Sequence, residues 1–191
     1  MPFGPEIIER LRAELPDEPP TPESTERRAA AVLVPLFIVG GEVGVVLTQR
    51  TAHLRSHSGQ VAFPGGGWEP GDATLKETAL RESFEEIGLD PNDVDVLGAM
   101  EDVPTVGSDY MVRPYVARIP HPYEFVPDPN EVERIILPPL DLFADLTRRR
   151  EEIRERDGRV YNVYFFDFEG AVVWGATARM LVSLVERLTG A

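Results

Sequence analysis

Apolar residues follow the chain with two different periods, and these periods predict which segments are strands and which are helices. Residues 30–39 form a nearly continuous apolar run rich in β-branched side chains, as expected of a strand buried on both faces. Gly40 and Gly41 then predict a tight turn into a second strand at residues 43–49. Residues 178–188 repeat apolar side chains every three or four positions, which predicts a helix that packs one face on a sheet.

The same reasoning places the other elements of the chain. It predicts an amphipathic helix at residues 5–15, strands at 94–103 and 111–119, a strand ending at residue 137, a short helix at 139–146, and a hairpin of strands 149–155 and 160–166. Prolines among acidic residues make residues 16–28 an extended linker. We therefore expect an N-terminal helix and proline-rich linker at residues 1–28 and one domain of the α/β or α+β class at residues 29–191.

Composition and charge narrow the classes of function. The chain has 191 residues, of which 42% are apolar, enough for one domain with a hydrophobic core. Its formal charge of −14 disfavours nucleic acid or an anionic membrane as a partner. The chain contains no cysteine, which excludes disulfides, a thiolate nucleophile and a zinc site of the thiolate type. With no signal-peptide pattern and no apolar run of membrane-spanning length, we expect a soluble cytoplasmic protein; the sequence leaves open whether it forms a homodimer.

The stretch with the strongest chemical signal begins with a further helix. Residues 74–87 contain no proline or glycine and are rich in helix formers. Asp72 or Thr74 is placed to cap the start of this helix, and Gly88 stands where a left-handed C-terminal cap belongs.

Three glutamates crowd onto one face near the end of this helix. Glu82, Glu85 and Glu86 stand at i, i+3 and i+4, where like charges repel and face the negative end of the helix dipole. A divalent cation resolves this conflict, because Mg²⁺ and Mn²⁺ prefer carboxylate oxygen. Arg81 is placed to orient one of the glutamates. The alternative is an acidic helix face exposed to solvent.

Residues 81–89, Arg-Glu-Ser-Phe-Glu-Glu-Ile-Gly-Leu, resemble the second half of the Nudix box, the signature of hydrolases acting on nucleoside diphosphates linked to another group. The first half departs from the pattern. Gly66 is followed after five residues by Asp72 in place of Glu, and eight residues rather than seven separate Asp72 from Arg81. The resemblance implies an α/β/α sandwich around a mixed β-sheet and metal-dependent hydrolysis of a pyrophosphate bond by water.

A second motif lies directly upstream, from Leu47 to Gly66. It consists of Leu-Thr-x-Arg ending at Arg50, then Arg55, Gly59 and Phe63-Pro64-Gly65-Gly66. Its spacing resembles the extended signature of the coenzyme A pyrophosphatase branch of the Nudix family. This resemblance implies that coenzyme A is split into 3′,5′-ADP and 4′-phosphopantetheine.

The arginines and glycines of this motif suit such a substrate. Arg50 and Arg55 are candidates for the 3′-phosphate ADP end, since guanidinium groups bind phosphate with two parallel hydrogen bonds; the alternative is a structural ion pair with the glutamate helix. Gly65 and Gly66 would let the backbone approach the pyrophosphate.

Several further residues are weaker candidates. Glu131 is a candidate for accepting a proton from water or for supporting the metal, and Arg113 for contacting phosphate. His53 and His57 lie in the arginine loop without a role fixed by the motif, and Trp68 would stack on adenine or cover the core.

Two rival functions stay open at this point. One keeps the reaction and changes the substrate to ADP-ribose, NADH or a dinucleoside polyphosphate. The other is a Nudix domain that senses a nucleotide without cleaving it, against which the intact set of glutamates argues.

Overall fold

The apolar run at residues 30–39 forms β1 (Arg28–Val39), which lies inside the largest sheet of the computed structural model. Its side chains alternate between two hydrophobic clusters, with Leu33 and Phe37 in one and Val34 and Leu36 in the other. The strand is therefore buried on both faces, as predicted. The structure describes residues 3–18, 27–51, 59–106, 108–156 and 158–190.

The large sheet is mixed. Strand β1 runs parallel to β8 (Tyr110–Arg118) and antiparallel to β2 (Glu42–Val45), which it meets across the predicted Gly40-Gly41 turn. Both glycines of this turn have positive φ, at 61° and 86°. Three further strands join the sheet: β6 (Asp95–Ala99) and β7 (Val103–Pro104) pair with β8, and β5 (Gly65–Gly67) pairs with β1.

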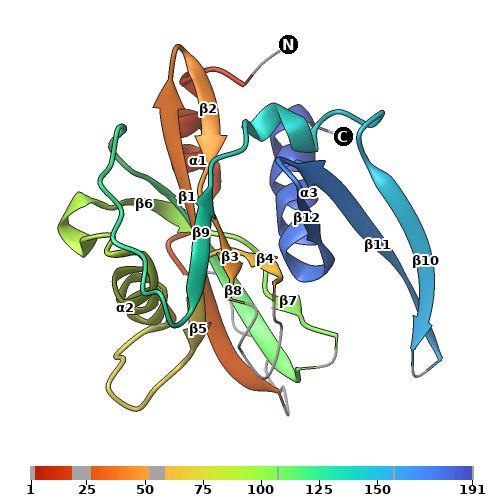
Figure 1. Cartoon of the computed structure of the whole chain (residues 1–191), viewed down its shortest axis with the longest axis horizontal. Helices are drawn as coiled ribbons and strands as arrows, with labels where there is room; N and C mark the ends of the chain where they lie inside the picture. Colours follow the sequence, from red (N-terminus) through yellow and green to blue (C-terminus); the bar gives the residue numbers. More distant parts are fainter. Residues whose placement is uncertain (1–2, 19–26, 52–58, 107, 157, 191) are drawn as a thin grey trace.

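Helices cover both faces of this sheet and confirm the predicted α/β/α sandwich. Helix α2 (Leu75–Ile87) packs on the face to which Leu33 and Phe37 point, whereas α1 (Glu6–Glu14) and α3 (Gly175–Thr189) share the opposite cluster. Figure 1 shows α2 and α3 on opposite sides of β1 and β8. None of the helices in the part of the chain that the structure describes is long and apolar enough to cross a membrane.

Two smaller sheets complete the fold beside the large one. In the first, β3 (Leu47–Arg50) lies between β4 (Val61–Ala62) and β9 (Val132–Ile136). In the second, β10 (Arg150–Arg156), β11 (Arg159–Phe168) and β12 (Ala171–Trp174) form the predicted hairpin with an extra strand that the sequence pattern did not indicate. Two 3₁₀ turns, η1 (Pro91–Asp93) and η2 (Leu140–Phe143), connect elements.

Some predicted elements were too long. The strand expected at residues 43–49 divides at Val46, whose N–H donates to the Pro35 carbonyl, so β2 and β3 belong to different sheets. The strand expected at 94–103 is interrupted after β6, and the helix expected at 139–146 is only the η2 turn. An apolar run predicts that a segment is buried, but it does not predict the sheet to which the segment belongs or where a strand is interrupted. This explains the errors.

The N-terminal helix packs into the same core as the rest of the chain. Ile7, Ile8 and Leu11 are buried with residues of α3 in one cluster, and the Arg10 guanidinium donates to the Leu188 carbonyl at 2.7 Å. Helix α1 therefore contributes to the common hydrophobic core. The boundary expected at residue 28, between the N-terminal segment and the domain, stays a prediction.

Candidate active site

Local sequence sets both ends of the glutamate helix. The Thr74 hydroxyl accepts a hydrogen bond from the Glu77 N–H at 3.2 Å and caps the start of α2. At the other end Gly88 adopts φ 67°, and its N–H donates to the Phe84 carbonyl. The helix predicted at residues 74–87 is confirmed, and its caps fix the positions from which Arg81 to Glu86 project.

The glycine segment of the upstream motif forms the short strand β5, which pairs with β1 and packs against α2. At Gly65, φ is +151° and a Cβ would lie 2.4 Å from the Ala31 carbonyl oxygen. At Gly66, a Cβ would lie 2.5 Å from the Glu82 carboxyl carbon. Only glycine leaves room for this approach, which brings bare backbone against the acidic face of α2. The Gly65 N–H also donates to Glu86 Oε2 at 3.3 Å.

Arg81 ties the start of the acidic cluster together. Its guanidinium binds both carboxylate oxygens of Asp72, Nε to Oδ1 at 2.9 Å and Nη2 to Oδ2 at 3.0 Å, and also reaches Glu82 at 2.9 Å and Glu85 at 3.1 Å. The Arg81 hydrogen bonds lower the pKa of Asp72 to about 2, against the opposing effect of burial. Asp72, one of the two residues predicted to cap α2, thus holds Arg81, while Thr74 is the cap.

Glu86 is the most buried acid of the group. Its residue is 4% exposed, and its Oε1 lies 3.5 Å from Arg50 Nη1. The same arginine lies 3.8 Å from Glu131 through Nη2. Burial raises the pKa of Glu86 to about 8; Arg50 and the Gly65 N–H oppose this shift, and the negative charges of Glu131 and Glu82 add to it. Burial likewise raises the pKa of Glu82.

The chemistry of these donors fits a hard divalent cation. Glu82 and Glu86 offer partly dehydrated carboxylate oxygens beside bare backbone, and their raised pKa values show that nearby positive charge does not fully compensate them. Glu85 has a 57% exposed side chain held by Arg81. Within the described ranges, no group of three or more His, Asp or Glu side chains is arranged to hold an ion. The joint ligand set of Glu82, Glu85 and Glu86 stays a prediction.

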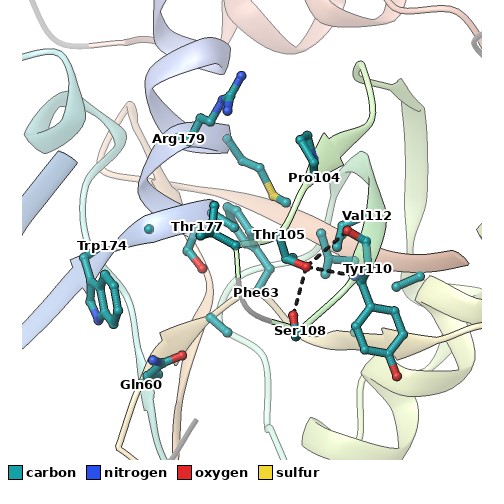
Figure 2. Close-up of a pocket in the computed structure, with 18 of the residues that line it drawn as sticks. Gln60, Phe63, Pro104, Thr105, Ser108, Tyr110, Val112, Trp174, Thr177 and Arg179 are labelled. Atoms are coloured by element: carbon teal, nitrogen blue, oxygen red, sulfur yellow. Dashed lines mark hydrogen bonds between the residues drawn. The ribbon is translucent and has the colours of Figure 1, made fainter. Parts of the chain in front are cut away.

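A cavity of about 550 Å³ lies on the other side of the glycine strand. Its wall is formed by β5 and by residues from β4, β8, β11 and the start of α3, several of which Figure 2 shows. Among the described residues that line it, three are arginines, Arg50, Arg154 and Arg179, and none is Asp or Glu. In a chain of formal charge −14, such a wall is suited to an anionic ligand.

Most described residues of the upstream motif that were singled out line the cavity, and Gly59 forms a turn instead. Arg50, Phe63, Gly65 and Gly66 line the cavity. The Nε of Arg50 is buried and has no hydrogen-bond partner among the described residues, while the Arg50 side chain as a whole is 26% exposed. Gly59 instead forms a turn with φ 69°, from which its N–H donates to the Arg50 carbonyl.

Other candidates lie elsewhere. Arg113 is wrong as a phosphate contact, because it is 3% exposed and paired with Asp102 at 2.7 Å and Glu18 at 2.9 Å. The half-exposed Trp68 donates its indole N–H to the Asp72 carbonyl and does not line the cavity. Arg55, His53 and His57 lie outside the described residues.

Sequence reasoning missed the part of the wall contributed by β11 and α3. Trp174, Thr177 and Arg179 line the cavity, yet the stripe of α3 indicated only a core helix. The sequence did contain two signals that the start of α3 faces a cavity. These are the glycine before the apolar stripe, Gly175, and the polar residue Thr177 in the first turn.

Comparisons with known proteins agree on one family. The NUDIX domain profile matches residues 26–162. A protein of Photorhabdus laumondii named "Uncharacterized Nudix hydrolase NudL" is 36% identical over 183 residues, covering 96% of each chain. "Nudix hydrolase 15, mitochondrial" of Arabidopsis thaliana is 35% identical over 175 residues, which cover 84% of this chain and 59% of the plant protein.

Solved structures share the fold. The NUDIX domain of Shewanella oneidensis NrtR, complexed with ADP ribose, superposes with a TM-score of 0.52 at 17% identity, covering 86% of this chain and 90% of that domain. A MutT/nudix family protein from Enterococcus faecalis reaches a TM-score of 0.58 at 13% identity, covering 90% of this chain and 66% of that protein. At these identities the likeness concerns the fold alone.

Proposed function

The chain belongs to the Nudix family of hydrolases, and on this premise we propose that it hydrolyses the pyrophosphate bond of coenzyme A or its derivatives. The products would be 3′,5′-ADP and 4′-phosphopantetheine or its acyl form. The observation that carries the proposal is the cavity beside β5, which has three arginines and no acid among its described lining residues. Four residues of the coenzyme A motif, Arg50, Phe63, Gly65 and Gly66, lie in its wall.

We propose that the three glutamates of α2 hold the divalent cation that Nudix hydrolases generally use, Mg²⁺ or Mn²⁺. When bound, such an ion would neutralise phosphate oxygens and make an attacking water more acidic. Glu82 and Glu86 would contribute through the oxygens that face β5, and Glu85 through its exposed carboxylate. Arg81 would act as a positioning residue, since it already holds Glu82 and Glu85 to the anchored Asp72.

The protein's own groups account for the other steps. The bare backbone of Gly65 and Gly66 lets a diphosphate lie against β5, and the partly exposed guanidinium of Arg50 donates to one of its oxygens. Water oxygen then bonds to phosphorus while the bridging P–O bond breaks, and the departing phosphate keeps the electron pair. Glu86 or Glu131 accepts the proton of the water.

Among the residues that the structure describes, Arg50 has only loose ion pairs, at 3.5 Å to Glu86 and 3.8 Å to Glu131. Such distances leave its guanidinium able to exchange a carboxylate for a phosphate. We expect Arg50→Lys to raise KM for coenzyme A about tenfold or more, because the two-pronged contact is lost while the charge stays. A purely structural arginine would instead lower thermal stability and leave KM unchanged.

The deciding experiment is a substrate panel with product identification by mass spectrometry. Coenzyme A, dephospho-coenzyme A, ADP-ribose, NADH and a dinucleoside polyphosphate are each incubated with the protein and Mn²⁺ or Mg²⁺. We expect coenzyme A to give 3′,5′-ADP with the highest kcat/KM. Preference for ADP-ribose or NADH would contradict the substrate, and cleavage of none of the five would revive the role of a nucleotide sensor.

The proposed metal ligands are tested by binding as well as by activity. Glu82→Gln, Glu85→Gln and Glu86→Gln should each weaken Mn²⁺ binding in calorimetry and lower kcat by about 10² or more. Glu133→Gln is the matched control, because Glu133 lies on the exposed face of β9. A glutamate whose variant binds Mn²⁺ and turns over like the control would be removed from the ligand set.

A further inference from the structure

The start of α3 forms a second polar region of the cavity, apart from Arg50 and β5. Trp174, Gly175, Ala176 and Thr177 all line the cavity, and Figure 2 shows Trp174 and Thr177 at this end of the helix. The helix has 15 residues, its N-cap Trp174 makes no side-chain capping bond, and its first turn contains no acidic residue. The N–H groups of such a turn carry partial positive charge and have no partner within the helix.

Thr177 is an independent sign that a ligand belongs here. The residue is only 9% exposed and lines the cavity; within the described part of the chain its hydroxyl makes no hydrogen bond, and the hydroxyl oxygen is not among the fully buried polar atoms. A hydroxyl that faces a cavity and has no protein partner is left to bond water or a ligand oxygen. At Gly175, a Cβ would meet no atom within 4 Å, so there is open space where a ligand oxygen would lie.

Charge favours an anion at this position. Arg179, one turn into α3, lines the same cavity, and no carboxylate among the described residues lies within ion-pair distance of it. Figure 2 shows the Arg179 side chain pointing away from Trp174 and Thr177, so Arg179 adds positive charge near this part of the cavity. Arg50, by contrast, lies between Glu86 and Glu131, which suits it to the bond that is cleaved rather than to a phosphate farther along the substrate.

We infer that the first turn of α3, with Thr177 as a contact and Arg179 as nearby positive charge, binds a phosphomonoester remote from the cleaved anhydride, namely the 3′-phosphate of the adenosine half of the substrate. This inference rests on the proposed function. Helix N-termini are well suited to phosphate, because several N–H groups point at the same oxygens along the helix dipole. The 3′-phosphate role considered for Arg50 and Arg55 passes to α3.

The test measures binding in EDTA, without turnover. Calorimetry compares adenosine 3′,5′-bisphosphate with adenosine 5′-monophosphate, which lacks the 3′-phosphate. We expect the native chain to bind the bisphosphate about tenfold more tightly. Ala176→Asp places a carboxylate at the helix start, where it favours the helix and repels phosphate, and should abolish the preference. Ala176→Asn, equal in size without the charge, should retain it, and Thr177→Val should reduce it about threefold or more.

Each outcome separates the inference from the function on which it rests. Equal binding of the two nucleotides by the native chain, or an unchanged preference in both Ala176→Asp and Thr177→Val, would overturn the α3 site. If the native chain then still cleaves coenzyme A to 3′,5′-ADP, the proposed function stands alone. If the preference depends on Ala176 and Thr177 while coenzyme A is not cleaved, the phosphate site stands and the proposed reaction falls.

Discussion

Removing the charge of Glu86 should make the metal-free protein more stable while it abolishes activity. The Glu86 carboxyl is buried, and this burial raises its pKa from 4.5 to about 8. A raised pKa means that the fold favours the protonated acid. The contribution to stability is therefore fully present below pH 4.5 and is lost as the pH rises through about 8. At pH 7 the ionisable side chain costs about 3 kcal/mol relative to one that is always neutral.

Glu86→Gln keeps the shape of the side chain and an oxygen that can accept from the Gly65 N–H, whose present bond is 3.3 Å long. Arg50 loses one distant partner and keeps Glu131. We expect the variant to unfold about 6–10 °C higher than the native chain at pH 7 in EDTA. Between pH 5 and 8 the native chain should lose stability relative to the variant.

The assay is calorimetric or circular-dichroism melting at several pH values, with urea titration at pH 7 as a second measure. Glu133→Gln, an exposed change on β9, should melt like the native chain at every pH. Added Mn²⁺ should stabilise the native chain more than the variant, because a ligand that binds only the folded state raises its stability. The reasoning would be refuted if Glu86→Gln melted no higher than the native chain at pH 7, or if the gap between them did not depend on pH.

Three further predictions follow from the same region. Gly65→Ala should destabilise the fold by about 2–4 kcal/mol in urea titration, because the new methyl group would meet backbone of β1 at positive φ. Gly66→Ala should change stability by less than about 1 kcal/mol yet lower kcat, since its methyl group meets the carboxylate end of the Glu82 side chain and no backbone atom. Asp72→Asn should lower the free energy of unfolding by about 1–2 kcal/mol above pH 4, because it weakens the pair with Arg81. The pKa of Asp72 is lowered to about 2, so the native carboxylate is protonated as the pH falls from 4 towards 2. Over that range the difference between the native and variant melting temperatures should close.

The parts of the site that depend on local sequence could be predicted. Helix α2 has its caps, Thr74 and Gly88, within its own segment, so its bounds and acidic face followed from the residue order. Strand β5 could not be predicted, because three glycines have low strand propensity and pair only because β1 lies beside them.

Long-range partners explain the remaining errors. Arg113 looked available for phosphate because its partner Glu18 is distant in sequence and Asp102 belongs to the preceding loop. The wall formed by α3 required two distant elements to meet across one cavity, and no periodicity within α3 records that meeting. Patterns of apolar residues identified which face of α3 is buried, but not that its first turn faces open space.

The glycine strand has one more consequence. Because β5 contributes no side chains, the same bare backbone lines the cavity and contacts the acidic side chains of α2. If the proposed roles hold, reactivity and substrate choice reside on separate helices, since α2 and α3 belong to different hydrophobic clusters. New preferences for the nucleotide could be engineered by changing residues in the first turn of α3 and its neighbours on β11, while the carboxylates of α2 are left unchanged.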